Sequence, residues 1–436
     1  MMMRSSRDGS SCAHGGVYED GPYKAHTVSL DQQQSRCGSK HNHQVGGGAA
    51  AATNETHLPP KPLLIAVPKA KGKYPVVQFQ HGFTLQNHFY SQLLLHLASH
   101  GFIVVAPQMY TISGSDATRE IEDAVAILNW MPSGLEMALP SSFLNAKPDF
   151  SKVALVGHSR GGKVVFGLAL GLRNSILQYS AVAGLDPVDG NAKGIQTQPP
   201  ILRFSQHSLN LGVPTLIVGS GLGALKRNYL FPPCAPEGVS HQAFFFDSSA
   251  PAFHFVAKEY GHMDFLDDDC KGAQGKLSYC VCKNGPSRSP MRRFAGGILA
   301  AFLQAALLNN TASFDAALAH PDLAPVLLEP PESYGKLPQK SQSSSCTSDL
   351  VIGIPLNSLV GYNLQETMAA DEVGSLSEFL TGIIDDNEAE NSQILDMLST
   401  SRKVEAVASV VEDQGLNQPP TLLQMRQLDR LLFRTM

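Results

Sequence analysis

The sequence lacks several features that would assign it to other classes of protein. No uninterrupted apolar run reaches the ~18 residues of a membrane-spanning helix, and the longest candidate, 294–308, contains Gln304. No apolar secretory segment follows Met1, because residues 1–16 are polar and rich in Gly and Ser. There is no basic excess either, since 33 Lys and Arg stand against 38 Asp and Glu. These absences argue against a transmembrane segment, secretion and nucleic-acid binding.

Cysteine is sparse, with seven residues in a chain of 436. An odd number of cysteines without a secretory leader predicts free thiols in a reducing compartment. Cys280 and Cys282 lie one residue apart, but zinc sites usually need a wider spacing and a second pair of ligands. We therefore predict no metal site.

The chain is long enough for one large domain with extensions, and no internal repeat is evident. Its composition changes after about residue 329, where two prolines precede a Ser-rich stretch. We predict four parts, in order: a disordered N-terminus over 1–16, a catalytic domain over 17–330, a Ser/Pro-rich linker over 331–348, and a helical or disordered tail of unknown role over 349–436.

Short apolar runs alternate with helical periods in the 17–330 domain. The strands that we predict are nearly continuous in Val, Ile and Leu, as in a sheet buried on both faces: 75–79, 102–106, 153–156, 181–185 and 214–218, with a further strand-like segment over 17–30. Helical periods occur around 90–97 and 121–128, and a closing helix is predicted over 291–308. The alternation predicts an α/β fold with a mostly parallel central sheet flanked by helices.

The segment Gly157-His158-Ser159-Arg160-Gly161 matches the G-x-S-x-G pattern of a nucleophile elbow. A predicted strand leads into it and a helical pattern over 163–172 leads out of it. Such a sharp turn needs small residues on either side of the serine, and Gly157 and Gly161 provide them. Five-residue patterns recur by chance, but this strand–turn–helix setting predicts Ser159 as the nucleophile of an α/β-hydrolase fold.

A serine hydroxyl needs a base, and this fold has the chain order Ser, acid, His. We predict His262, which lies in a glycine-containing loop after the last predicted strand and before the closing helix. Four other histidines fit less well: His254 between two phenylalanines, His241 in a predicted surface loop, His207 ahead of the 214–218 strand, and His158 beside the nucleophile itself.

The acid should follow a strand between the serine and the histidine. Asp186 comes directly after the 181–185 strand, at the same sheet edge as the nucleophile. The 214–218 strand ends in Gly-Ser-Gly and offers no carboxylate, and Asp264 is too close in sequence to His262. We predict Asp186, with Asp189 as the alternative if it is not simply a turn residue.

An oxyanion hole needs two backbone N–H donors. We predict Arg160, which follows the nucleophile, and Phe83, which follows the His81-Gly82 pair after the 75–79 strand. A hydrophobic substrate would also need an apolar groove near this edge. The candidates for that groove, which could equally be core residues, are Phe83, Leu85, Phe89, Tyr110 and Ile112.

At this point the sequence resembles the plant chlorophyllases. The nucleophile segment continues into Gly162 and Lys163, and its Arg and Lys are features that most esterases lack. The resemblance extends in order over 89–92, 98–108, 184–188, 260–264 and 282–285, whereas the sequence after about 339 has no counterpart that we recognise.

The resemblance implies a serine carboxylesterase that cleaves the phytyl ester of chlorophyll to chlorophyllide and phytol, with Ser159, Asp186 and His262 as its triad. It implies no cofactor, no nucleic-acid partner, and at most peripheral association with a membrane. The implied compartment is the chloroplast, with the cytosol or an endomembrane-associated site as alternatives; the N-terminus contains Asp8, and transit peptides are poor in acidic residues. The alternative functions are a general lipase or carboxylesterase and a non-catalytic protein that binds a hydrophobic ligand.

Overall fold

The computed structural model of the chain describes residues 16–30, 58–110, 113–143, 145–228 and 231–337. Several sequence-based predictions fall outside these described residues: the disordered N-terminus apart from residue 16, most of the 331–348 linker, the 349–436 tail, and Ile112. They stay predictions.

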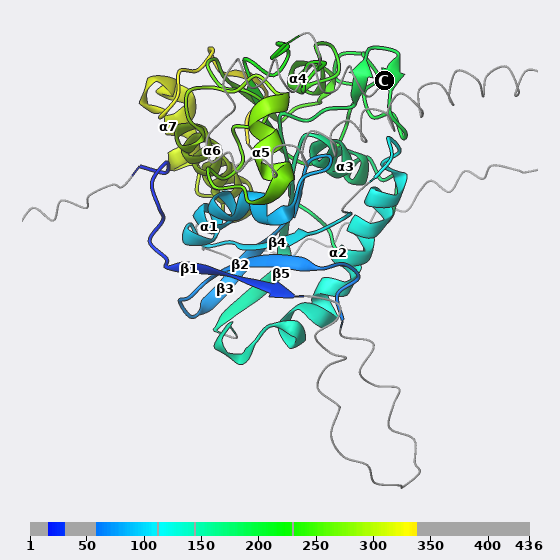
Figure 1. Cartoon of the computed structure of the whole chain (residues 1–436). Helices are drawn as coiled ribbons and strands as arrows, with labels where there is room; N and C mark the ends of the chain where they lie inside the picture. The colour runs from blue at the N-terminus through cyan, green and yellow to red at the C-terminus, as the bar shows by residue number, and fades with distance from the viewer. Residues whose placement is uncertain (1–15, 31–57, 111–112, 144, 229–230, 338–436) are drawn as a thin grey trace, which may run out of the picture. The chain divides into compact units, whose positions relative to one another are not determined.

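Strands and helices alternate along the described chain (Figure 1). The strands are β1 (Ala25–Leu30), β2 (Leu63–Pro68), β3 (Gly72–Gln80), β4 (Ile103–Pro107), β5 (Ala146–His158), β6 (Ala181–Leu185), β7 (Gly190–Ala192), β8 (Ile195–Gln196), β9 (Thr215–Ser220), β10 (Ala252–Ala257) and β11 (Glu332–Tyr334). The α-helices are α1 (Ser91–Ser99), α2 (Thr118–Ala138), α3 (Arg160–Ala169), α4 (His241–Asp247), α5 (Gly272–Val281), α6 (Arg288–Leu308) and α7 (Ala312–Ala319), and the short 3-10 helices are η3 (Asn87–Tyr90), η4 (Ser141–Phe143) and η5 (Pro321–Leu323).

Nine strands form one sheet in the order β1-β2-β4-β3-β5-β6-β9-β10-β11. The six strands from β4 to β10 in this order are parallel, and the antiparallel pairs lie at the two margins of the sheet. With helices on both faces (Figure 1), this arrangement confirms the predicted α/β-hydrolase fold.

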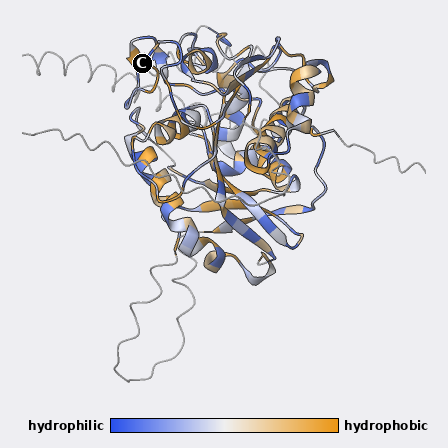
Figure 2. Cartoon of the chain, turned by 180° about the vertical axis from the view of Figure 1, so that it is seen from behind, coloured by the Kyte–Doolittle hydropathy of each residue, from blue (hydrophilic) through white to orange (hydrophobic). Residues whose placement is uncertain are grey.

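Neighbouring residues of a strand point to opposite faces of the sheet, and here both faces are covered. Val77 and Val156 belong to the core that contains α1 and α6, whereas Val76 and Leu155 belong to the core that contains α2 and α3. Strands buried in this way are apolar at most positions, with exceptions such as Gln78 and Gln80 of β3, which explains their nearly continuous hydrophobic runs. Figure 2 shows hydrophobic and hydrophilic residues along the same strands and helices, seen from behind.

The parallel register brings the carboxyl ends of the central strands to one edge. Gln80 of β3 is paired with Gly157 of β5, and His158 of β5 with Leu185 of β6. The loops that follow these strands therefore start side by side, and they carry the residues that we predicted for the oxyanion hole, the nucleophile and the acid.

Predictions from local sequence patterns gave the wrong bounds or the wrong setting for some elements. β5 begins seven residues before the predicted 153–156 strand, and α3 begins at Arg160, immediately after the nucleophile. His241 is not in a surface loop: it is the buried first residue of α4. The His241 ring packs closely against Gly219 of β9, where a Cβ would lie 2.3 Å from the His241 Nδ1. Local sequence does not reveal such a contact between distant segments.

Among the described residues, one helix is long and apolar enough to cross a membrane by length and composition alone. That helix is α6, and 78% of its most apolar window is buried inside the protein. It covers one face of the sheet together with α1, as a core helix does.

Asp267 provides a test of how burial affects stability in this fold. Its Oδ1 accepts a hydrogen bond from the Gln92 N–H at the start of α1, 3.0 Å away. Burial nevertheless raises the pKa of Asp267 to about 6, because the loss of hydration outweighs the contributions of that N–H and of the Arg292 charge. The stabilising contribution of this carboxyl is therefore complete below its unfolded pKa of about 3.8 and is lost as the pH rises through about 6.

We therefore expect Asp267→Asn, which keeps an acceptor and removes the charge, to raise the free energy of unfolding at pH 7.5 by about 2 kcal/mol. Urea denaturation at pH 7.5 and at pH 4.5 checks this, and the gain should shrink at the lower pH. A variant that is less stable than the parent at pH 7.5 would contradict the argument.

Candidate active site

Ser159 occupies the tight turn between β5 and α3. Its backbone has φ 56° and ψ −122°, a left-handed conformation that is strained for a residue with a side chain. The flanking glycines are required by close contacts: a Cβ on Gly157 would lie 2.1 Å from the Gly161 oxygen, and one on Gly161 would lie 2.2 Å from the Gln80 oxygen. This packing holds the serine at the sheet edge and at the N-terminus of α3.

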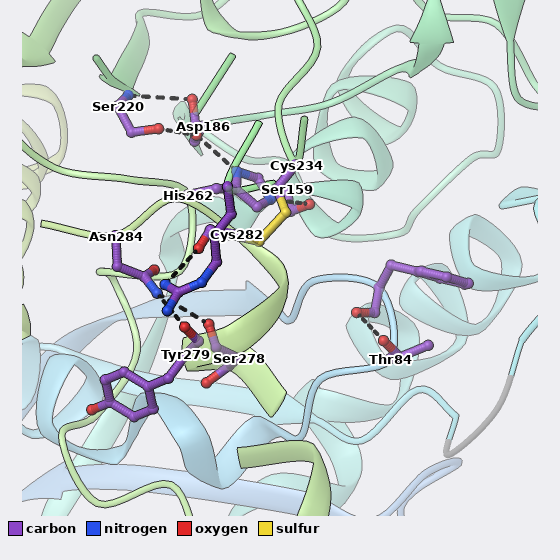
Figure 3. The surroundings of a disulfide bond; sticks show 12 residues. Thr84, Ser159, Asp186, Ser220, Cys234, His262, Ser278, Tyr279, Cys282 and Asn284 are labelled. Atoms are coloured by element: carbon purple, nitrogen blue, oxygen red, sulfur yellow. Dashed lines mark hydrogen bonds and ion pairs between the residues drawn. A yellow bond between two sulfur atoms is a disulfide. The ribbon is translucent and has the colours of Figure 1, made fainter. Parts of the chain in front are cut away.

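Ser159, His262 and Asp186 form a continuous hydrogen-bonded row (Figure 3). The His262 Nε2 lies 2.8 Å from the Ser159 Oγ, and the His262 Nδ1 lies 2.7 Å from Oδ2 of Asp186. A carboxylate oxygen can only accept, so Nδ1 carries the proton and Nε2 is free to accept the hydroxyl proton of Ser159. All three side chains are buried. The structure therefore brings together the three residues that we predicted, in the arrangement that activates a serine.

Asp186 stays a carboxylate in spite of complete burial. Burial alone would raise its pKa, but the hydrogen bond and charge of His262, the charge of His241 and the Ser220 hydroxyl lower it below 3.8 in sum. Ser220 donates to Asp186 through both its hydroxyl and its N–H. Sequence reasoning missed Ser220 because it searched the end of β9 only for a carboxylate.

The loop that carries His262 is fixed at its base by Asp264. Oδ2 of Asp264 accepts hydrogen bonds from the N–H groups of Gly261 and Gly285, each at 2.7 Å. A side chain at position 261 would lie 1.7 Å from the Lys283 oxygen, so only glycine allows the two segments to approach this closely. Asp264 therefore supports the position of His262 and is not a second acid for it.

A disulfide between Cys234 and Cys282 joins the segment after β9 to the segment that contacts the His262 loop (Figure 3). This corrects our prediction of free thiols for these two residues and removes Cys282 as a partner of Cys280 in a metal site. The pair is 48 residues apart in the sequence, and only the fold brings the two Cα atoms to 5.7 Å. Within the described residues, Cys270 and Cys280 are free, and no group of three or more His, Cys, Asp or Glu side chains is arranged to hold a metal ion.

The two predicted oxyanion donors are close to the nucleophile along the chain or through a contact: Arg160 follows Ser159, and Phe83 follows Gly82, on which a Cβ would lie 3.2 Å from the Ser159 Cβ. In the described part of the chain, no hydrogen bond occupies the backbone N–H of Phe83 or of Arg160. His81 orients the first of these amides, because its Nδ1 donates to the Gly82 oxygen at 2.8 Å and so fixes the Gly82–Phe83 peptide group. The opposite nitrogen of His81 accepts from the Met109 N–H, and burial lowers the pKa of His81 to about 4, so the ring stays neutral with its proton on Nδ1.

The Arg160 side chain fixes the segment that precedes α2. It forms an ion pair with Glu120 and donates to the backbone oxygens of Gly114 and Asp116. Its guanidinium lies 5.0 Å from the ring centre of Phe83 and 5.8 Å from that of Tyr110. The result is an aromatic pair against which the cation of Arg160, the residue after the nucleophile, is held.

The remaining groove candidates differ in exposure. Phe83 is 36% exposed, and Tyr110 is partly buried beside it. Leu85 and Phe89, at 4% and 1%, lie in the core around α1 and α6, which is the alternative that we kept open for them. Contact with a substrate therefore stays a prediction for Phe83 and Tyr110.

The rival acid and histidines lie elsewhere. Asp189 is fully buried and forms an ion pair with Lys163 at 2.9 Å. His241 and His254 are hydrogen-bonded to each other, and His207 contacts the Ser248 backbone. His158 contacts the backbone of His262, and no hydrogen bond joins it to Ser159 in the described structure.

Known proteins are similar in sequence to most of the described part of this chain. A family model described as Chlorophyllase matches residues 13–335. The chain belongs to the chlorophyllase family. Chlorophyllase-2 of Arabidopsis thaliana is 49% identical over 301 residues, which cover 68% of this chain and 91% of that protein. Chlorophyllase-1 of Arabidopsis thaliana is 44% identical over 281 residues, which cover 64% of this chain and 86% of that protein. Chlorophyllase-1, chloroplastic, of Citrus sinensis is 44% identical over 275 residues, which cover 62% of this chain and 80% of that protein.

Membership of the chlorophyllase family confirms the resemblance inferred from the sequence and makes the chain a carboxylic ester hydrolase with a hydrophobic ester as its substrate class. The match ends two residues before the end of the described chain. The assignment of individual residues to catalytic roles rests on the geometry described above.

Proposed function

We propose that this protein hydrolyses the phytyl ester of chlorophyll, releasing chlorophyllide and phytol, with Ser159 as the nucleophile. The observation that carries the proposal is the row of hydrogen bonds from Ser159 through His262 to Asp186, at the elbow of a chain that belongs to the chlorophyllase family. A serine activated in this way attacks ester carbonyls.

The first half of the reaction forms an acyl-enzyme. His262 Nε2 takes the Ser159 proton while Oγ adds to the carbonyl carbon, and the negative charge develops on the carbonyl oxygen. The N–H groups of Phe83 and Arg160 stabilise that oxyanion, each by about 3 kcal/mol in typical cases. The tetrahedral intermediate collapses, the imidazolium gives its proton to the phytol oxygen, and phytol leaves.

The second half returns the enzyme to its starting state. A water molecule gives a proton to His262 and adds to the acyl carbon, the oxyanion forms again, and Ser159 leaves with the proton returned by His262. Chlorophyllide departs as the carboxylic acid, which then loses its second water-derived proton to the solvent. Throughout, Asp186 accepts from Nδ1 of His262 and stabilises the imidazolium when it forms.

The surroundings of Ser159 support a large apolar substrate. Phe83 and Tyr110 present aromatic surface next to the predicted oxyanion hole, and the Arg160 guanidinium holds both rings in place. We further propose that the reaction takes place in the chloroplast, the compartment in the name of the Citrus sinensis relative, and that the protein reaches its substrate by peripheral contact with a membrane.

Product analysis of the purified protein incubated with chlorophyll tests the proposal. We expect chlorophyllide and phytol in equal amounts, with both products increasing linearly with the concentration of protein. A matched incubation with a short-chain aryl ester measures how selective the site is.

The two alternative functions give different outcomes. Fast turnover of the aryl ester with no chlorophyllide would identify a general carboxylesterase and overturn the proposed substrate. Absence of turnover of either ester, together with a Ser159 that does not react with a fluorophosphonate, would identify a non-catalytic binding protein.

A further inference from the structure

Two buried aromatic residues that the reaction above does not use lie directly behind the nucleophile. Tyr90 is the last residue of η3, and His158 is the last residue of β5, one position before Ser159. Both are 0% exposed, and the Tyr90 Oη lies 2.7 Å from the His158 Nδ1. Each makes one further hydrogen bond, and these two bonds lead to different loops of the active site.

The proton positions in this chain of hydrogen bonds follow from the partners at its ends. The His158 Nε2 lies 2.9 Å from the backbone oxygen of His262, which can only accept, so Nε2 carries the proton and Nδ1 is an acceptor. Tyr90 therefore donates to His158. The Tyr90 oxygen in turn accepts from the Gly82 N–H at 3.1 Å. The order is Gly82 N–H to Tyr90, Tyr90 O–H to His158, and His158 Nε2–H to the His262 carbonyl.

This row of hydrogen bonds ends at the two loops that must be aligned with Ser159. Gly82 immediately precedes Phe83, the predicted oxyanion donor, and the His262 carbonyl belongs to the residue whose imidazole takes the serine proton. The approach is very close: a Cβ on Gly82 would lie 3.0 Å from the His158 Nδ1 and 3.2 Å from the Ser159 Cβ. Any displacement of His158 would therefore shift the Gly82 loop, the turn with Ser159 and the His262 loop.

The surroundings of His158 keep its ring uncharged near neutral pH. Its ring centre is 4.7 Å from that of His262 and 5.2 Å from that of Phe265. Burial, followed by the charge of His262, lowers the pKa of His158 to about 3, and burial keeps the pKa of Tyr90 well above 10. Both groups are therefore neutral near pH 7, and no second charge competes with the imidazolium of His262.

We propose that Tyr90 and His158 are positioning residues that align the oxyanion loop and the His262 loop with Ser159 through one hydrogen-bonded bridge. The inference rests on the proposed hydrolase function and deepens it. Catalysis by an oxyanion hole and a general base depends on donors and acceptors fixed within fractions of an ångström, and a displacement of about 1 Å can cost roughly 100-fold in rate. The bridge supplies that constraint from behind the nucleophile, where substrate does not reach.

The bridge is tested by removing its parts singly and together. Tyr90→Phe keeps the ring but removes the hydroxyl that Gly82 and His158 share, and His158→Asn keeps a polar group near Tyr90 but is too short to reach the His262 carbonyl. We expect each variant to lower kcat by roughly 10- to 100-fold with KM nearly unchanged, because the ester-binding surface is untouched. The double variant should lose much less than the product of the two single losses, since both remove the same bridge.

Tyr179→Phe is a matched control. Its hydroxyl donates to the Leu168 oxygen at 2.8 Å, outside the active site, so its loss should lower thermal stability and leave kcat unchanged. Wild-type kcat in Tyr90→Phe, measured well below its unfolding temperature, would show that the bridge only packs the core and would overturn the proposal. Independent, multiplicative effects of the two substitutions would overturn it as well. Tyr90→Phe decides the question alone if His158→Asn does not fold.

The rate of fluorophosphonate labelling at Ser159 separates this inference from the proposed substrate. If the wild-type protein is labelled but releases no chlorophyllide, the substrate proposal fails, and the bridge is still tested by the slower labelling expected of Tyr90→Phe. If both proteins are labelled at the same rate, the bridge proposal fails whatever the substrate.

Discussion

Replacing Ser159 by alanine should reduce the release of chlorophyllide from chlorophyll by about 10⁴- to 10⁶-fold. The size of the effect follows from the loss of the covalent path, since only the oxyanion hole and substrate binding would remain to accelerate attack by water. Chromatographic quantification of chlorophyllide over long incubations measures this residual rate.

The fold should tolerate this change. Ser159 already adopts a left-handed backbone conformation, and alanine has the same Cβ, so the strain at the elbow is retained rather than increased. The Ser159 hydroxyl has His262 as its hydrogen-bond partner, which would then face a small apolar group. Circular dichroism and a thermal unfolding curve close to those of the parent would attribute the loss to chemistry.

Ser220→Ala is the matched serine control for this prediction. It removes a hydroxyl from the same buried network, but that hydroxyl contacts Asp186 and not the substrate. We expect it to lose only about tenfold in kcat, the lower end of what one supporting hydrogen bond to a catalytic group typically contributes, and to keep its reaction with a fluorophosphonate. Labelling that persists in Ser159→Ala, or substantial residual hydrolysis by that variant, would remove Ser159 from the role of nucleophile.

The sequence predicted the parts of the site that depend on local constraints. The elbow around Ser159 could be predicted because Gly157 and Gly161 flank the serine within one strand–turn–helix unit, although the contact that requires Gly161 is with Gln80 at the end of β3. His262 and Asp186 followed from the chain order of the fold and from the position of a strand end. The steric requirement at the elbow is visible within a few neighbouring residues, whereas the choice of His262 and Asp186 also needed the order of the elements along the whole fold.

The parts that could not be predicted depend on contacts between distant segments. Ser220 acquires its role only because β9 lies next to β6, where its hydroxyl reaches Asp186. The Cys234–Cys282 disulfide and the burial of His241 likewise arise from segments that the fold brings together. Residue type alone cannot signal such pairings, because serine, cysteine and histidine are common in other surroundings.

Replacing Asp186 by asparagine should lower kcat by about 10⁴-fold while the protein remains folded. Asparagine can still accept from Ser220, but its amide can donate to Nδ1 of His262 and so favour the tautomer with the proton on Nε2. A protonated Nε2 cannot accept the serine proton, and an imidazolium would lack its counter-charge. Steady-state kinetics with chlorophyll measure the loss, and fluorophosphonate labelling should slow in parallel.

Asp189→Asn separates this role from the alternative assignment of the acid. Asp189 forms a fully buried ion pair with Lys163 and accepts from the N–H groups of Ile201 and Leu202. Neutralising it leaves the buried Lys163 charge with hydrogen bonds to Thr197 but no counter-charge, so we expect a loss of about 3 kcal/mol in the free energy of unfolding. The fraction that stays folded should turn over at close to the parental rate, because no hydrogen bond joins Asp189 to His262 in the described structure.

The two substitutions therefore predict opposite patterns: Asp186→Asn is stable and inactive, whereas Asp189→Asn is unstable and active. An inactive but stable Asp189→Asn beside an active Asp186→Asn would reassign the acid to Asp189. That result would also require His262 to leave the 2.7 Å contact with Asp186 during turnover, because one imidazole cannot be oriented by both carboxylates at once.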